Sequence, residues 1–108
     1  MAPCYVEVKN VHLRRNGDVA EFPDCITLRG TKHMQELATI VSRGTQAVIF
    51  YVVQRQDCRS LQIAHDIDVH YGWAYQRALL QGVKQICYQC EVTLQGITLS
   101  VPLPIINR

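Results

Sequence analysis

The sequence predicts one α/β domain with a mixed sheet, two helices and the element order β-β-α-β-α-β-β. Two kinds of apolar pattern indicate this class: some segments alternate with a period of two, as strands do, and two others repeat at helical spacing. A third observation is the continuous apolar run over residues 47–53, which is typical of a central strand with parallel neighbours. The chain has 108 residues, of which 48% are hydrophobic and 19% are charged. This length and composition suit a single core over residues 1–108 and exclude an intrinsically disordered chain.

The first strand is predicted over residues 4–13, where side chains of different character alternate. Val6 and Val8 are expected on one face of this strand, and Glu7 and Lys9 on the other, because successive strand residues point to opposite sides.

A hairpin and a helix are expected next. Asn16-Gly17 is a turn signal, and residues 19–22 can return as the second arm of the hairpin. The apolar spacing then changes to that of a helix over residues 27–43, with either Thr27 or Thr31 as its N-cap.

The second half of the chain continues the alternation of strand and helix. The strand at residues 47–53 is apolar throughout, so we expect helices to cover both of its faces. Residues 54–67 are polar and are predicted to be irregular, and Asp68 is predicted to cap a second helix that ends at Gly82. Residues 83–92 and 97–101 complete the predicted strands.

Charge and hydropathy limit the cellular location and the binding partners that we expect for this protein. Eleven Lys and Arg against nine Asp and Glu give a net charge of +2, which neither requires nor excludes nucleic acid. The sequence has no apolar run near 18 residues, and its first residues lack the features of a secretory signal. We therefore expect a cytoplasmic protein with no membrane partner.

Five cysteines without a secretory signal do not indicate a disulfide framework. Cys87 and Cys90 have the spacing of half a zinc site, but on a strand their thiols point to opposite faces, and no second ligand pair completes the site. We therefore predict no zinc, and small strand residues with one buried thiol.

Glu7-Val8-Lys9 is the first candidate for chemistry. Strand geometry places Glu7 and Lys9 on one face, where the carboxylate and the Val8 carbonyl could hold Mg²⁺ while the ammonium stabilises charge on a phosphate. The alternative interpretation is an exposed salt bridge that contributes little to stability.

A polar stripe at the start of the first predicted helix is the second candidate. It consists of Thr27, Arg29, Lys32 and His33. Cationic groups near a helix N-terminus attract anions, so these residues are predicted to contact nucleic-acid phosphates. A solvated helix face would show the same pattern.

The segment HDIDVH contains further metal-ligand types, namely His65, Asp66, Asp68 and His70. Asp68 is already explained as a helix cap, so a metal cluster here is the less favoured interpretation.

Six segments together resemble a known family. They are CYVEVKNVHL (4–13), FPDCITLRGTKHMQEL (22–37), QAVIFYVVQR (46–55), AHDID (64–68), YGWAYQRALLQGVKQICYQCEV (71–92) and LPI (103–105). They resemble the C-terminal part of the bacterial sugar fermentation stimulation protein A, and the most specific pattern is F-P-D-x-x-T-x-R-G-x-K-H-x-x-E-L.

The resemblance implies a restriction-endonuclease-like PD-(D/E)xK fold, DNA binding and a link to the regulation of sugar (maltose) metabolism genes. In that superfamily an Asp on one strand, followed by a Glu and a Lys on the next, binds Mg²⁺ and organises phosphodiester hydrolysis. Glu7 and Lys9 match the second half of this motif, and Lys32 and His33 match the family's K-H pair.

The sequence also departs from the family. The family's N-terminal OB-like domain and the strand that carries the Asp have no counterpart here, and no acidic residue precedes Glu7. Asp18, Glu21 and Asp24 follow it and could approach it in another order. Catalysis is therefore left open, and DNA binding by this chain alone is expected to be weak.

A non-catalytic interaction module is the alternative function. A sheet that lacks one strand exposes an unpaired edge, which favours self-association into a homo-oligomer.

Overall fold

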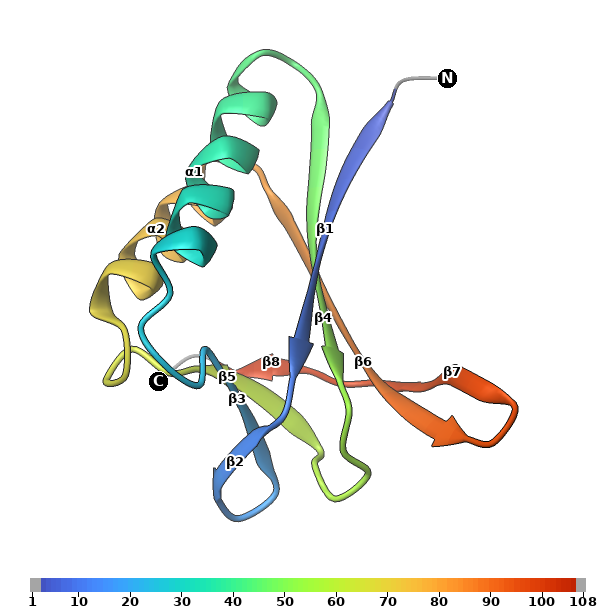
Figure 1. Cartoon of the computed structure of the whole chain (residues 1–108). Helices are drawn as coiled ribbons and strands as arrows, with labels where there is room; N and C mark the ends of the chain where they lie inside the picture. Colours follow the sequence, from blue (N-terminus) through green and yellow to red (C-terminus); the bar gives the residue numbers. More distant parts are fainter. Residues whose placement is uncertain (1–2, 107–108) are drawn as a thin grey trace.

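The structure, a computed structural model, describes residues 3–106, which form two helices and two four-stranded sheets (Figure 1). The first sheet, called sheet A, contains β1 (Cys4–Val11), β4 (Gln46–Val53), β6 (Lys84–Thr93) and β7 (Gly96–Pro102), in that order. The second sheet, sheet B, contains β2 (Leu13–Asn16), β3 (Val19–Phe22), β5 (Ser60–Ile63) and β8 (Ile105–Ile106), in that order.

Sheet A has the predicted parallel centre. Strands β1, β4 and β6 run parallel to one another, and β7 is added antiparallel at one edge, while β1 forms the other edge. The prediction of one sheet is wrong, because the β2–β3 hairpin does not continue β1 but pairs through β3 with β5. Strand β5 lies in the segment that was predicted to be irregular. The alternating pattern that would predict this strand is short, because only Leu61 and Ile63 alternate with polar neighbours.

Both helices have side-chain caps that the sequence indicates. Helix α1 (Leu28–Ser42) begins at Thr27, whose hydroxyl accepts a hydrogen bond from the Gly30 N–H at 2.9 Å. Helix α2 (Val69–Gln81) begins at Asp68, whose Oδ1 accepts from the Tyr71 N–H at 3.1 Å. The other oxygen of Asp68 accepts from the Thr27 N–H at 2.8 Å, so one buried carboxylate ties the starts of both helices together.

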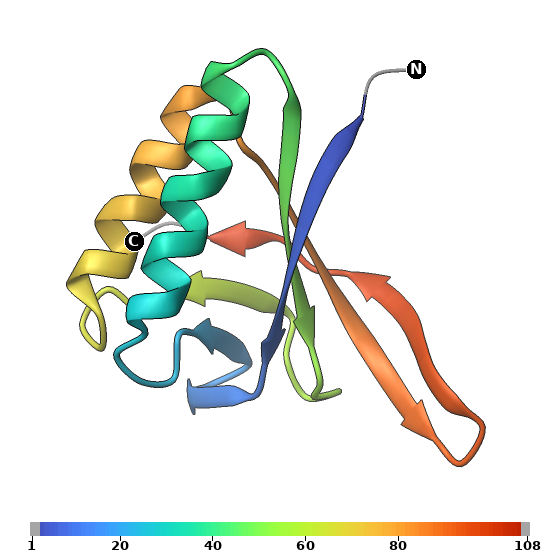
Figure 2. The ribbon, with the colours of Figure 1, turned by 45° about the horizontal axis from the view of Figure 1, so that its top comes forward.

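The helices lie side by side on the same face of sheet A (Figures 1 and 2). The core lies between the helices, sheet A and sheet B, and its largest fully buried side chains include Ile49, Tyr51, Met34 and Tyr71. In the part of the chain that the structure describes, neither helix is long and apolar enough to cross a bilayer.

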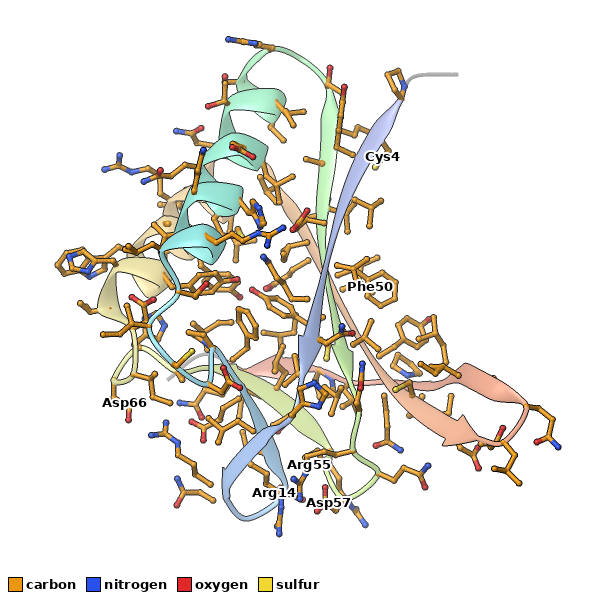
Figure 3. All side chains as sticks on the ribbon, in the orientation of Figure 1. Cys4, Arg14, Phe50, Arg55, Asp57 and Asp66 are labelled. Atoms are coloured by element: carbon orange, nitrogen blue, oxygen red, sulfur yellow. The ribbon has the colours of Figure 1, made fainter. Side chains whose placement is uncertain are left out.

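The prediction that helices cover β4 on both faces is wrong. The odd-numbered positions of the strand face the helices and are buried, whereas Val48, Phe50 and Val52 are only half-buried. Figure 3 shows Phe50 on the side of the sheet that points away from α1 and α2. The continuous apolar run therefore reflects one face inside the core and a second face that no helix within residues 3–106 covers.

The cysteines on β6 alternate as strand geometry requires. Cys87 belongs to the core cluster under the helices, whereas Cys90 is outside that cluster. Both thiols are buried and not bonded to another cysteine, which corrects the prediction of a single buried thiol.

Candidate functional site

Three predicted site residues converge between β1 and the N-terminal half of α1. The Nδ1 atom of His33 lies 2.8 Å from Lys9 Nζ and 2.9 Å from Glu7 Oε1, and Lys9 Nζ lies 3.4 Å from the same carboxylate oxygen. Glu7 and Lys9 were expected to share a face of the strand, and they do. Their direct contact with His33 was not predicted, because it depends on how the helix crosses the strand.

This cluster differs from the exposed salt bridge that was its alternative interpretation. The side chain of Lys9 is only 13% exposed, and those of His33 and Glu7 are 21% and 33% exposed. Partial removal of water strengthens the electrostatic interaction between the charged groups. The cluster is therefore a partly enclosed polar site at the edge of the core.

One hydrogen bond in the cluster joins Lys9 and His33. His33 Nδ1 accepts it from the Lys9 ammonium when that nitrogen carries no proton. The contact of the same nitrogen with Glu7 Oε1 is an ion pair only when the imidazole is charged. The two contacts of Nδ1 therefore correspond to different protonation states of His33.

A pair of buried tyrosines lies on the helix-covered side of sheet A, the side to which Lys9 also points. Tyr51 is the register partner of Lys9 on the neighbouring strand, and its hydroxyl is 2.6 Å from the hydroxyl of Tyr71 on α2. Burial, more than any charge, raises the pKa of both phenols, and the nearby Glu7 carboxylate is among the smaller causes for Tyr71. Both hydroxyls therefore remain protonated at neutral pH. The two residues are 20 positions apart on a strand and a helix, and no local pattern indicates that their hydroxyls pair.

The remaining residues of the predicted stripe have different environments. Arg29 and Lys32 are exposed on α1, and Arg29 lies one turn before His33 on the same side of the helix. Thr27 differs, because its hydroxyl is occupied by the helix cap. Val8 separates Glu7 from Lys9 and directs its side chain to the opposite face of the strand.

The other acidic and histidine candidates do not join this site. Glu21 is buried and accepts two hydrogen bonds from Arg15, which also binds Asp66. Within residues 3–106, no group of three or more His, Cys, Asp or Glu side chains could hold a metal ion. This finding removes the cluster that HDIDVH suggested, and it leaves Glu7 with no second carboxylate from the described residues.

The donor set fits one side of a hard-cation site. Mg²⁺ and Ca²⁺ prefer oxygen ligands, and Glu7 supplies a carboxylate of that type to the cluster.

Comparison with known proteins assigns the family. A family model described as the sugar fermentation stimulation protein RE domain, SfsA, matches residues 1–96. The chain belongs to this family. The resemblance drawn from the six sequence segments is thereby confirmed.

Relatives of the SfsA chain are similar along nearly its whole length. The sugar fermentation stimulation protein homologue of Jannaschia sp. is 50% identical over 102 residues, which are 94% of this chain and 42% of the relative. That of Rhodospirillum centenum is 54% identical over 94 residues, covering 87% of this chain and 40% of the relative. The chain thus spans less than half the length of these curated relatives.

A solved structure agrees with the fold. SfsA of Pyrococcus furiosus, solved in complex with Ca²⁺, matches with a TM-score of 0.87 and 26% identity, over 95% of this chain and 45% of that one. The match fits the nuclease-like α/β fold that the resemblance implied. The presence of Ca²⁺ in that structure indicates a divalent cation for the relative.

Proposed function

We propose that this SfsA chain binds the DNA backbone, and that a divalent cation held at Glu7 takes part in the binding. The observation that supports the proposal most is the convergence of a carboxylate, an ammonium and an imidazole within 3.4 Å, with exposed cations on the adjacent helix. The Ca²⁺ complex of the Pyrococcus furiosus relative supports the cation part of the proposal.

Each residue has a separate role in this proposal. Glu7 and the Val8 carbonyl are the cation ligands, and Mg²⁺ is the proposed ion because it combines carboxylate ligands with phosphate oxygens. Lys9 stabilises negative charge on the phosphate or orients a water molecule, and His33 accepts from Lys9 and so fixes its position. Arg29 and Lys32 neutralise neighbouring phosphates.

Cleavage of a phosphodiester needs more cation ligands than these residues supply. A metal-assisted attack on a phosphodiester is stabilised by ligands on both sides of the cation, and residues 3–106 provide one carboxylate at the cluster. We therefore expect phosphodiesterase activity only where a second carboxylate is supplied from outside the described residues. The link to sugar-metabolism genes would then operate through DNA binding rather than through cleavage by this chain.

DNA binding tests the proposal directly. Fluorescence anisotropy of a labelled duplex, measured at increasing salt with either Mg²⁺ or EDTA, should show weak binding that falls with salt. With Lys9, Arg29 and Lys32 as phosphate contacts, log K should fall with log salt with a slope of about −3. Glu7→Gln should lose the increment in affinity that Mg²⁺ provides, whereas Glu91→Gln, which removes an exposed carboxylate on β6, should keep it.

Three results would contradict the proposal: no detectable binding, binding that does not change with salt, or an equal Mg²⁺ increment in Glu7→Gln. Incubation of supercoiled and single-stranded DNA with Mg²⁺ addresses cleavage separately. Equal nicking by the unmodified chain and by Glu7→Ala would exclude a phosphodiesterase centred on Glu7.

A further inference from the structure

Helices α1 and α2 lie side by side (Figure 2), and a groove runs between their solvent-facing sides. We call it the helix groove, and it is lined by Thr31, Gln35 and Ala38 of α1 and by His70, Trp73, Ala74 and Arg77 of α2. The small side chains of Ala38 and Ala74, one from each helix, leave the space between the helices open. Its volume of about 350 Å³ lies within the range of about 300 to 1,000 Å³ that is typical of ligand sites.

Trp73 is the only tryptophan of the chain, and its indole is exposed in this groove. The residue is 61% exposed, although tryptophan is highly buried on average in folded proteins. Tyr71 and Tyr75 on the same helix point into the core instead. The His70 ring lies 5.5 Å from the Trp73 ring at an angle of 85°, and this contact restricts rotation of the indole. An exposed and oriented indole is a surface on which a planar group stacks.

The polar groups of the helix groove are basic or neutral. Arg77 and His70 are its ionisable residues, and Thr31 and Gln35 add uncharged groups that can donate and accept hydrogen bonds. No carboxylate is among the lining residues. Glu36, the only acidic residue within α1 and α2, lines a separate surface of α1. The groove therefore suits a ligand that is planar in one part and negatively charged in another.

The excess positive charge of the chain is concentrated on the helices. Within α1 and α2, the cations Arg29, Lys32 and Arg77 outnumber the one carboxylate, so the two helices carry a net charge of +2. The whole chain also has a net charge of +2, so the charges of the other segments balance. The regular phosphates of a nucleic-acid strand match such a basic surface, whereas an ordinary polypeptide segment has no comparable series of negative charges. A basic groove with an exposed aromatic ring is typical of proteins that bind single strands.

We propose that the helix groove binds an unpaired base of a DNA strand, with the base stacked on the Trp73 indole and a neighbouring phosphate bound by Arg77. Thr31 and Gln35 offer hydrogen bonds to the edge of that base. This inference rests on the proposed DNA binding and adds the form of the DNA, because in a duplex the faces of the bases are covered by one another.

The groove and the Glu7–Lys9–His33 cluster lie on opposite sides of α1, since the groove faces α2 and the cluster faces β1. A helix is about 10 to 12 Å across, which about four nucleotides span at ~3.4 Å each. One short strand can therefore cross α1 and reach both places, and Arg29 and Lys32 lie on the helix that it crosses.

The single tryptophan makes stacking directly measurable by its fluorescence. Oligothymidylate of about ten nucleotides, a length within the site sizes of single-strand binders, should quench the Trp73 emission and bind more tightly than a duplex of the same length. Thymidine monophosphate at the same nucleotide concentration should quench less, because it lacks the further phosphates that Arg29 and Lys32 contact.

Trp73→Ala should weaken binding of labelled oligothymidylate at least about fivefold in fluorescence anisotropy, the lower end of the effect of losing one stacked base. Trp73→Phe should keep part of the affinity, and neither variant should change the affinity for duplex DNA. Leu94→Ala is the matched control and should bind normally. It truncates a fully exposed apolar side chain in the turn between β6 and β7, far from both helices (Figure 2).

The phosphate contact has its own test in the salt dependence. Arg77→Gln should reduce the slope of log K against log salt by about 0.7 for the single strand. Arg59→Gln removes the same charge from a side chain that is 88% exposed in the connection before β5, and it should leave the slope unchanged.

Equal affinity of Trp73→Ala and the unmodified chain for the single strand would overturn the inference, and so would the absence of quenching at saturation. Equal quenching by the monophosphate would also overturn it, because the ligand would then be a free nucleotide. If duplex binding persists in any of these cases, the proposed function stands without the groove. Binding of neither form of DNA would overturn both proposals together.

Discussion

The two faces of sheet A are built from the same strands but have different chemistry. The face under the helices combines the core with a tyrosine pair and the charged Glu7–Lys9–His33 cluster. The opposite face, which we call the open face, includes Val8, Phe50 and Ile86; no helix of residues 3–106 covers it, and Lys84 stands beside Val48 on it. Because strand residues alternate, neighbours such as Val8 and Lys9 belong to entirely different environments.

This difference separates the roles of the two faces. The covered face contributes most of the buried core and positions the candidate site, whereas the open face contributes less buried area. A substitution on one face should therefore leave the property of the other nearly unchanged.

The largest expected effect concerns stability at two adjacent valines of β4. Val53 is fully buried in the core and Val52 is half-buried on the opposite face of the strand. Val53→Ala should reduce the free energy of unfolding by about 2 to 3 kcal/mol, because it removes buried methyl groups and leaves a cavity. Val52→Ala should cost less than about 1 kcal/mol in the monomer. Urea unfolding below 1 μM, a concentration chosen to disfavour association, measures both, and equal losses would mean that the faces are equally packed.

The tyrosine pair should show an intermediate effect. Tyr51→Phe leaves the Tyr71 hydroxyl without its partner in a buried setting, which should cost about 1 to 2 kcal/mol. The double variant Tyr51→Phe/Tyr71→Phe should lose less than the sum of the two single variants, since no buried hydroxyl is then left unpaired. Strictly additive losses would show that the hydroxyls do not interact.

The smallest expected effect concerns how the free energy of unfolding depends on pH. It comes from ionisation of the buried phenols and is absent at neutral pH. Burial raises the pKa of Tyr75 to about 12, and it also raises the pKa values of Tyr51 and Tyr71 above the usual value near 10. The unfolded chain therefore releases these protons first, so the contribution of the phenols to stability is constant below about pH 10 and falls as the pH rises towards 12. Burial also raises the pKa of the Cys87 thiol to about 12, so the fall in total stability begins near the usual thiol pKa of 9.0. Unfolding free energies at pH 8, 10 and 11 should follow this course, with a shallower decline in Tyr75→Phe. A flat profile would mean that the phenols reach water in the folded chain.

Local patterns predicted much of the fold correctly. The alternation in β1, the caps Thr27 and Asp68 and the end of α2 at Gly82 each depend on a few neighbouring residues. Strand β5 escaped prediction because four residues give too little periodicity to distinguish a strand from a loop. The division into two sheets escaped it as well, because pairing of β3 with β5 joins residues that are about 40 positions apart.

The candidate site, too, was predicted only as far as local sequence patterns reach. The sequence by itself determined that Glu7 and Lys9 share a face, that the first helix carries cations near its start and that the chain resembles the SfsA family. Only the tertiary structure decided that His33 contacts both residues, that Tyr51 and Tyr71 bond beneath them and that one face of sheet A stays uncovered. The physical reason is range: backbone geometry fixes where nearby side chains point, whereas contacts across the fold depend on how helices pack on strands.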